Sequence, residues 1–479
     1  MNMTDLTVLA PLIIPSTTAV AVMLMIAFYR NHAFTVSLTL AGLALTVAGC
    51  IGVARMAPRE VTPLLMIDHY ALFFMGLIVL AAFAVAALSY SYLEIHAGHR
   101  EEFYLLVLLA SLGCAVLAAA SHFASFFLGI ELLSVSLYAL AAYLRHSDRS
   151  VEAGVKYLIL AAVSSAFILF GMALVYAETG SMAFREIGSS ASGPGVHGLP
   201  FLAGIGMIIV GVGFKLAVVP FHLWTPDVYE GAPAPVTAFI ATASKGAVFA
   251  LVLRYFTKID IHAYPALFTI MTIIAVASMF AGNLLALLQT NVKRILAYSS
   301  ISHLGYLLVT VLASGSMALT AAAFYLAAYF ITTLGSFGVV TVLSGPDRDA
   351  DRMDDYLGLV WRRPWLAGVF TAMLLSLAGM PLTAGFVGKF YVVAAGVGST
   401  LWLLVIVLAI NSVIGLFYYL RIIVALFARS EEEGPAGLAA SRTSSGSVAL
   451  GTLTLLLVCL GVYPGPVIEL IKKTIQSLL

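Results

Sequence analysis

Stretches of about 20 apolar residues follow one another along almost the whole chain, and this pattern restricts its fold more than any other feature. A helix of that length crosses the roughly 30 Å hydrocarbon core of a bilayer. Hydrophobic residues make up 62% of the 479 residues and charged residues only 10%, which excludes a soluble globular fold. The sequence therefore predicts an all-α membrane protein of about 14 transmembrane helices. The expected spans are 6–28, 33–54, 69–94, 102–120, 122–143, 152–177, 201–230, 234–256, 264–288, 292–313, 316–344, 365–396, 400–428 and 447–466.

Composition also excludes several kinds of function. The formal net charge of +1 provides no basic face for nucleic acid. Cys50, Cys114 and Cys459 stand alone in apolar runs, whereas zinc and iron-sulfur sites need several ligands at short spacing. We therefore expect no metal, no bound cofactor and no disulfide in this chain. The polar stretches are too short for a second core, so residues 1–479 are expected to form one polytopic membrane domain.

Basic residues indicate how the bundle is oriented. Lys and Arg are more frequent in the connecting segments on one side of the expected bundle than on the other. Under the positive-inside rule, the richer side faces the cytoplasm. The bias therefore favours a multi-pass protein with both termini in the periplasm.

A few ionisable residues lie inside otherwise apolar spans. Lys215, Lys245, Lys389 and Glu131 each have apolar neighbours for at least a turn in both directions. A charged residue at the centre of a membrane helix costs about 2.5–3.5 kcal/mol, so their presence favours a functional role. For Lys156, which follows a loop, a side chain that reaches back to the interface is an equally good explanation.

Such groups have the energetics that proton transfer requires. Burial weakens the proton affinity of a lysine, and a carboxylate within about 4–6 Å restores it by about 1–3 pK units. One pK unit corresponds to about 1.36 kcal/mol, and moving one charge across 100 mV takes about 2.3 kcal/mol. A carboxylate that approaches and retreats can therefore load and unload a buried amine against a membrane potential.

Two of the spans contain helix breakers at corresponding places. The breakers are Pro220 and Pro226 in the seventh span, and Gly379, Pro381 and Gly385 in the twelfth. Because proline removes a backbone donor, each span is expected to split into two half-helices. Paired broken helices are typical of transporters built from inverted repeats. We therefore predict two inverted five-helix repeats, about 102–256 and about 264–428, although a simple kink remains an alternative for either span.

Two histidines are candidates for a proton relay. His222 follows the first break, where it can carry protons or simply satisfy a free carbonyl. His303 has hydroxyl neighbours at helical spacing, which suits a polar channel, and polar helix packing is the competing explanation. These neighbours are Ser299, Ser300, Ser302 and Tyr306.

Three segments carry a resemblance to a known family. They are KLAVVPFHLWTPDVYEGAPAPVTAFIATASK, NLLALLQTNVKRILAYSSISHLGYLL and LLSLAGMPLTAGFVGKFY. With them, nearly the whole chain resembles the proton-translocating membrane subunits shared by bacterial respiratory complex I and the multisubunit cation/proton antiporters. The segments around Lys156 and Asp355 and the lysine at 389 are most similar to one branch of the complex I subunits. Another branch, subunit M, usually carries glutamate at the position of Lys389, and a third, subunit L, is much longer.

The resemblance implies roles for individual residues. Glu131 would pair with Lys215, Lys245 would link the two repeats, and Lys389 would serve the periplasmic exit. Lys156 and His222 match accessory positions of the family. NADH, flavin, iron-sulfur clusters and quinone would be bound by partner subunits. This chain would therefore contribute to a translocase without redox chemistry of its own.

The resemblance also implies a location and partners. The chain would lie in the bacterial inner membrane beside other complex I membrane subunits, especially the antiporter-like subunit M and the small subunits J and K. Two other functions stay open. A sodium/proton antiporter subunit would need an ion-selective carboxylate site, and a scaffold subunit would have an inactive channel.

Overall fold

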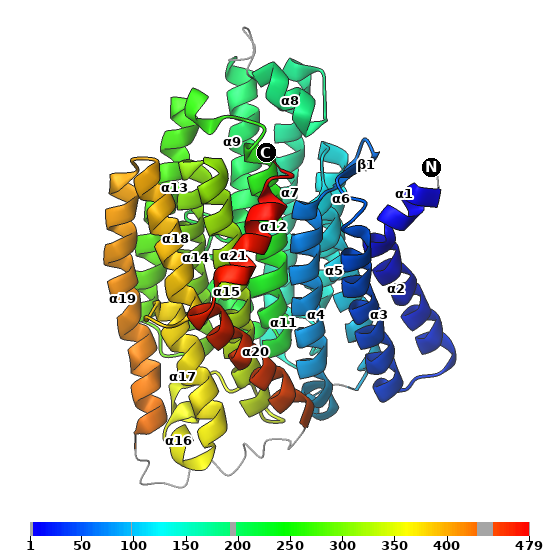
Figure 1. Ribbon diagram of the computed structural model, residues 1–479. Helices are drawn as coiled ribbons and strands as arrows, with labels where there is room; N and C mark the ends of the chain where they lie inside the picture. The colour runs from blue at the N-terminus through cyan, green and yellow to red at the C-terminus, as the bar shows by residue number, and fades with distance from the viewer. Residues whose placement is uncertain (1–2, 97, 192–197, 429–443, 479) are drawn as a thin grey trace.

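The fold is a bundle of long, roughly parallel helices with little other structure (Figure 1). The computed structural model describes residues 3–96, 98–191, 198–428 and 444–478. The amino and carboxyl ends lie toward the same face of the bundle, the upper face in Figure 1. An even number of crossings accounts for that arrangement.

Within the described residues, 12 helices are long and apolar enough to cross a membrane, and each one falls on a predicted span. The all-helical membrane fold is therefore confirmed. These helices are α2 (Ala10–Phe28), α3 (His32–Val53), α4 (His69–His96), α5 (Glu101–Ala119), α6 (Phe123–Ala141), α7 (Asp148–Thr179), α9 (Leu199–Leu216), the continuous run Ala234–Phe256, α13 (Pro265–Leu287), α14 (Val292–Ala313), α15 (Gly315–Leu343) and α19 (Trp402–Phe427).

The two remaining predicted spans are interrupted. The span 365–396 consists of α17 (Pro364–Ala378) and α18 (Ala384–Gly398). The span 447–466 corresponds to α20 (Ser444–Val462), after which α21 (Gly465–Ile475) continues at an angle of 84°, a bend that was not predicted. Pro464 at the junction cannot supply a helical N–H, which explains the break. The buried residues Ile468, Ile471 and Ile475 recur every three or four positions, so α21 packs one apolar face on the bundle.

Short elements connect the long helices. β1 (Arg59–Thr62) and β2 (Leu65–Ile67) form an antiparallel hairpin with an irregularity between Glu60 and Thr62. The other short elements are α1 (Met3–Val8), α8 (Phe184–Ala191), α10 (Trp224–Gly231), η2 (Ile261–Ala263), η3 (Met353–Tyr356) and α16 (Leu359–Arg362). The run Ala234–Phe256 itself consists of α11 (Ala234–Phe239), the π-helix η1 (Ile240–Ser244) and α12 (Lys245–Phe256).

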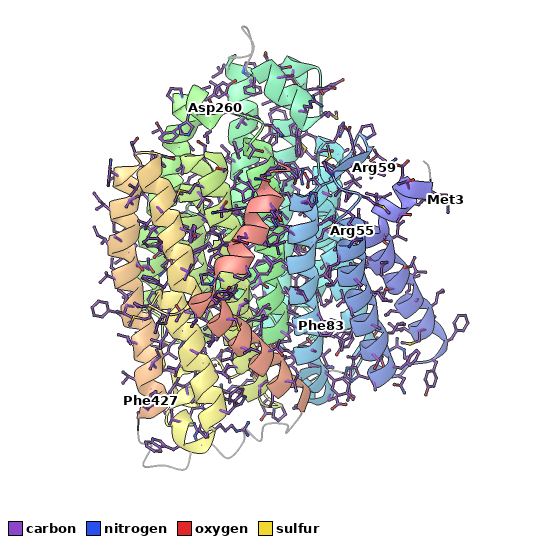
Figure 2. All side chains as sticks on the ribbon, in the orientation of Figure 1. Met3, Arg55, Arg59, Phe83, Asp260 and Phe427 are labelled. Carbon is purple, nitrogen blue, oxygen red and sulfur yellow. The ribbon has the colours of Figure 1, made fainter. Side chains whose placement is uncertain are left out.

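The bundle has an enclosed centre and a peripheral layer. α11 to α12, α14 and α15 are almost wholly buried, whereas fewer than half of the residues in α2, α7 and α19 are buried. In Figure 2, charged Arg55, Arg59 and Asp260 lie toward the upper end of the bundle, and Phe83 lies along its side. Apolar side chains gain nothing by leaving lipid, so close packing of small residues holds such helices together. Gly171 on α7 and Gly204 on α9 illustrate this, because a Cβ on either one would lie within 3 Å of the other's carbonyl oxygen.

The two broken spans enter from opposite faces. α9 descends from the upper face to the middle of the bundle, and α17 rises from the lower face to the middle (Figure 1). α10 and α18 then complete the two crossings. This antiparallel relation is the one expected of inverted repeats. The exact limits of the repeats, about 102–256 and 264–428, stay a prediction.

A buried ion pair lies near the end of the bundle that carries the termini. Arg254, near the end of α12, donates to both oxygens of Asp68 at 2.8 and 2.7 Å, and both side chains are at most 5% exposed. Asp68 also accepts from the backbone N–H of Ala71 at 2.7 Å, at the start of α4. The pair thus joins α12 to α4.

Removing one partner of this pair is expected to destabilise the protein strongly. Asp68→Leu leaves a buried guanidinium without its counter-ion, a change that costs about 3–5 kcal/mol. The thermal unfolding midpoint of the purified protein should fall, and combining Asp68→Leu with Arg254→Met should restore much of it. Arg59→Ala is the control, because the more exposed Arg59 to Asp5 pair is worth at most about 1 kcal/mol. If Asp68→Leu unfolds at the parental temperature, the pair does not stabilise this end.

Candidate functional site

The first broken helix positions Lys215. α9 ends at Leu216 because Ala217 takes a left-handed conformation (φ 60°), and Trp224 Nε1 donates to the freed carbonyl of Phe214 at 3.0 Å. The break covers 217–223, and α10 starts at Trp224. Pro226, predicted as a breaker, instead lies in the first turn of α10, where its missing N–H costs nothing. Lys215 therefore occupies the last turn of a half-helix, where backbone carbonyls favour a cation.

Lys215 and Glu131 approach each other without touching. The Lys215 amine is 5% exposed and donates to Ser134 at 2.6 Å. Glu131, one turn earlier on α6, accepts from Ser165 of α7 and is half-buried. The carboxylate is close enough to act electrostatically on the amine, but the two form no ion pair. Their pairing, which the resemblance implies, would require a small movement of either side chain.

Lys245 lies at the centre of the protein, immediately after the π-helix. Its amine is 1% exposed and donates to Ser300 of α14 at 2.7 Å. Ser300 also accepts from the hydroxyl of Tyr329 on α15 at 2.8 Å. The amine lies 5.3 Å from the centre of the Tyr229 ring. π-Helical turns often mark functional sites, and this turn is followed directly by Lys245, the first residue of α12.

His303 is surrounded by phenols from two other helices. Its Nδ1 is 2.7 Å from the hydroxyl of Tyr325 on α15, and its Nε2 is 3.2 Å from that of Tyr419 on α19. Tyr419 also bonds to Ser299. Of the neighbours that the sequence offered, Tyr306 packs against the imidazole ring, whereas Ser302 bonds to a backbone carbonyl. Tyr325 and Tyr419 were not predicted as neighbours of His303, because they lie on other helices and nothing in the sequence near His303 points to them.

The second broken helix positions Lys389. α17 ends at Gly379, whose φ of 84° suits glycine, and a Cβ there would lie 2.8 Å from the Lys389 side chain. The Lys389 amine donates to the carbonyl of Ala378 at 2.8 Å and to Ser412 at 2.9 Å. It is thus held at the carboxyl end of the half-helix α17. Gly385, predicted as a breaker, lies in the first turn of α18, where its N–H bonds to Ser376.

Lys156 and His222 lie outside this buried group. The Lys156 amine is 2.7 Å from Glu152 and 2.8 Å from Asp227, with the side chain 41% exposed. Asp227 also pairs with Arg294 of α14, so the network joins the two repeats. His222 is buried, and neither ring nitrogen makes a hydrogen bond of normal geometry, although the backbone of Pro220 lies nearby. The structure brings neither residue to Lys245 or His303.

Lys293, in the first turn of α14, is a further buried lysine. Its amine, wholly enclosed, donates to three oxygens: Glu230 O at 3.0 Å, Ala232 O at 2.7 Å and Asp349 Oδ2 at 2.7 Å. Burial by itself would raise the pKa of Asp349, but Lys293 and the Tyr92 hydroxyl outweigh it and hold that pKa below its usual value. Lys293 is therefore a fully paired, structural cation.

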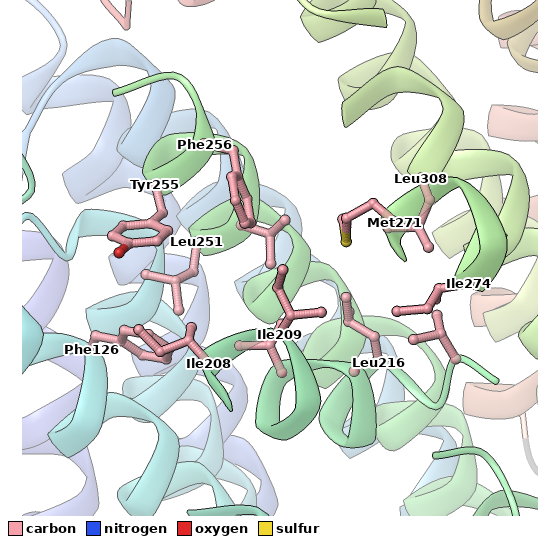
Figure 3. A pocket seen from close by; sticks show the side chains of 14 residues that line it. Phe126, Ile208, Ile209, Leu216, Leu251, Tyr255, Phe256, Met271, Ile274 and Leu308 are labelled. Atoms are coloured by element: carbon pink, nitrogen blue, oxygen red, sulfur yellow. The ribbon is translucent and has the colours of Figure 1, made fainter. Parts of the chain in front are cut away.

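Two cavities flank the buried lysines. A polar cavity of about 1040 Å³ opens among the loops of the face opposite the termini, and its lining includes Arg30, Arg149, Glu230 and Asp349. A smaller apolar pocket of about 30 Å³ lies between α6, α9, α12 and α13 (Figure 3). Its lining is apolar apart from Tyr255, so it does not suit proton chemistry. Within the described residues, no group of three or more His, Cys, Asp or Glu is arranged to hold a metal ion.

Comparison with known proteins identifies the family. Residues 120–415 match the model of the family described as NADH:quinone oxidoreductase/Mrp antiporter, TM. The chain is 50% identical over 478 residues to NADH-quinone oxidoreductase subunit N of Ectopseudomonas mendocina (strain ymp), covering 97% of this chain and 95% of the relative.

Solved structures agree on the fold. A chain of respiratory complex I from Thermus thermophilus, solved with bound aureothin, is 33% identical with a TM-score of 0.82 and covers 96% of this chain and 98% of its own. An archaeal membrane-bound sulfane sulfur reductase matches at 23% identity with a TM-score of 0.86, covering 99% and 98%. The Mrp complex from Dietzia sp. DQ12-45-1b matches at 19% identity with a TM-score of 0.87, covering 100% and 98%. The last two share the fold alone. The chain belongs to the NADH:quinone oxidoreductase/Mrp antiporter family of membrane subunits, and within that family to the subunit N branch.

Proposed function

We propose that this chain is a proton-translocating membrane subunit of NADH-quinone oxidoreductase, which moves protons through its buried lysines while quinone is reduced elsewhere in the complex. One contrast carries the proposal. The buried cations Lys293 and Arg254 each contact a carboxylate, whereas Lys215, Lys245 and Lys389 contact only hydroxyl or carbonyl oxygens. An amine buried without a counter-ion is held only weakly in its charged form. Such a group can gain and lose a proton during each cycle.

The proposed route follows these contacts. A proton would enter near Glu131 and Lys215, pass to Lys245, move by way of Ser300, Tyr329 and His303, and leave from Lys389. His303 and Lys389 interact electrostatically, which supports their neighbouring places in the route. Direct hydrogen bonds join Lys245, Ser300 and Tyr329, whereas the other steps of the route need water or a side-chain movement. Lys156 and His222 would act at most as accessory groups.

Redox chemistry would belong to partner subunits. NADH, flavin, iron-sulfur clusters and quinone are assigned to them in this proposal, so this chain would bind no cofactor. The surroundings of Glu131 support the proposal that a protein partner covers this face. Glu131 is half-buried on α6 between Leu128 and Val135, which are 62% and 61% exposed. A carboxylate facing lipid there would be costly. We therefore propose that another complex I membrane subunit, such as M, J or K, covers this face.

The proposed location is the bacterial inner membrane with both termini in the periplasm. The loops that line the polar cavity would then face the cytoplasm, and the cavity would supply protons. Arg30, Arg145, Arg149, Arg348 and Arg352 lie around it, in agreement with the positive-inside rule.

Changing either Glu131 or Lys215, the proposed entry groups, is expected to slow pumping about tenfold or more. Glu131→Gln removes the charge that acts on Lys215, and Lys215→Ala removes the amine, while general acid-base groups typically contribute at least 10²-fold. Inverted membrane vesicles would be tested for acidification per NADH oxidised, in medium with and without sodium. Electron transfer from NADH to an artificial acceptor should be unchanged. Parental acidification in both variants would favour a scaffold role, and pumping that depends on sodium would favour an antiporter.

A further inference from the structure

The link between α10 and α11 is held unusually firmly for a loop. Lys293 donates to the carbonyls of Glu230 and Ala232 on either side of Gly231. The Thr237 hydroxyl donates to the carbonyl of Tyr229 at 3.2 Å. A Cβ on Gly231 would lie 2.4 Å from the backbone oxygen of Arg149, so α7 packs directly on the link. The last turn of α10 therefore has a fixed position relative to Lys245.

This turn connects the polar cavity with the protein interior. Glu230, Gly231 and Pro233 line the cavity, together with Asp349, the partner of Lys293. Tyr229, the residue before Glu230, is completely buried on the inner side of the same turn. Of two successive residues, one therefore lines the cavity and the next one back is enclosed in the protein.

The Tyr229 phenol lies beside the Lys245 amine. Lys245 Nζ is 5.3 Å from the centre of its ring, and the phenol also faces Ser300 and Tyr329. Its hydroxyl makes no hydrogen bond of normal geometry with a described residue, and its nearest polar neighbour is the Ser300 side chain. A buried hydroxyl without a well-formed hydrogen bond is unfavourable, so this phenol is suited to exchange its proton with a water or with the Lys245 amine.

We propose that Tyr229 is the proton carrier between the loop-side cavity and Lys245, a role that rests on the proposed function of the chain. A proton arriving from the cavity binds the phenol oxygen while the phenol's own hydroxyl proton passes to the neutral Lys245 amine. The amine becomes ammonium and the phenol is neutral again, so no charge remains on Tyr229. Lys293 acts as a positioning residue, because it fixes the turn that carries the phenol.

This route gives Lys245 its own access to protons. Lys215 is then not the only group that can pass a proton to Lys245. Ser300 hydrogen-bonds to both Lys245 and Tyr329, and it also lies beside Tyr229. Lys245 would then receive protons by two routes, one through Lys215 and one through Tyr229.

The test compares two tyrosines of equal burial. Tyr229→Phe removes the proposed carrier hydroxyl, and Tyr255→Phe removes another buried hydroxyl that has no partner, on α12 next to the apolar pocket. Both variants, with Lys245→Ala as reference, would be assembled in the whole complex and checked for normal levels in the membrane. Acidification per NADH oxidised by inverted vesicles is expected to fall about tenfold for Tyr229→Phe and to stay parental for Tyr255→Phe.

Each outcome decides one question. Parental acidification with Tyr229→Phe would overturn the inference, and so would equal losses in both phenylalanine variants, since removal of any buried hydroxyl would then suffice. If Lys245→Ala itself pumps at the parental rate, the proposed function fails instead. As a second readout, the pH profile of coupled turnover should change in Tyr229→Phe, which a purely structural hydroxyl would not cause.

Discussion

Replacing Lys245 with alanine is expected to reduce proton pumping about 100-fold or more, the scale on which a positioned acid-base group acts. Lys245 lies at the junction of the two repeats, because it starts α12 in the first and donates to Ser300 on α14 in the second. Alanine leaves Ser300 and Tyr329 in place but without a group that can hold a charge. Acidification of inverted vesicles per NADH oxidised is the measurement.

A lysine on the neighbouring segment provides the matched control. Lys258 follows α12 and donates to the carbonyl of Leu478 at 3.0 Å, near the face of the termini. Lys258→Ala should pump at the parental rate. If Lys245→Ala assembles at normal levels and pumps like Lys258→Ala, the proton does not pass through Lys245.

The second large effect is expected at Lys389, where Lys389→Arg should assemble yet pump about 100-fold less. A role in holding and releasing a proton requires a titratable group, and guanidinium stays protonated in practice. The acceptors of Lys389, the carbonyl of Ala378 and the hydroxyl of Ser412, can both accept from arginine, so the positive charge would persist at the end of α17. The proton would then have no group from which to leave.

Lys389→Glu separates a proton-holding role from a fixed charge. A protonated glutamic acid can donate to Ala378 O, and the carboxyl end of a helix disfavours the anion, so this side chain would also bind a proton. We expect Lys389→Glu to retain more pumping than Lys389→Arg, with membrane levels measured for both. The opposite order, with arginine fully active and glutamate inactive, would make Lys389 a fixed charge and remove it from the proposed route.

Local sequence was enough for the spans and for most of the buried charges. Apolar length is a property of each segment alone, so the predicted spans coincide with the observed helices, including the break near Gly379. Lys215, Lys245 and Lys389 were recognisable because their neighbours along the chain are apolar. The bend at Pro464 was missed, since the apolar run continues past Val462 and only the packing of α21 on the bundle fixes its direction.

Contacts between distant segments decided the rest. Lys293 follows a loop in the sequence, yet Asp349 and the α10 to α11 link enclose it completely. The phenols of Tyr325 and Tyr419 reach His303 from two other helices, and Tyr229 reaches Lys245 across the link between α10 and α11.

The sequence by itself determined that the chain spans a membrane, that the seventh and twelfth spans break and that Lys215, Lys245 and Lys389 are buried, because hydrophobicity and backbone breakers act within one segment. Only the tertiary structure decided which buried cations have a carboxylate partner. Lys293 and Arg254 have one, whereas Lys215, Lys245 and Lys389 do not. The physical reason is that electrostatic pairing falls off within a few ångströms, and side chains from segments far apart in the chain come that close only after the bundle has packed.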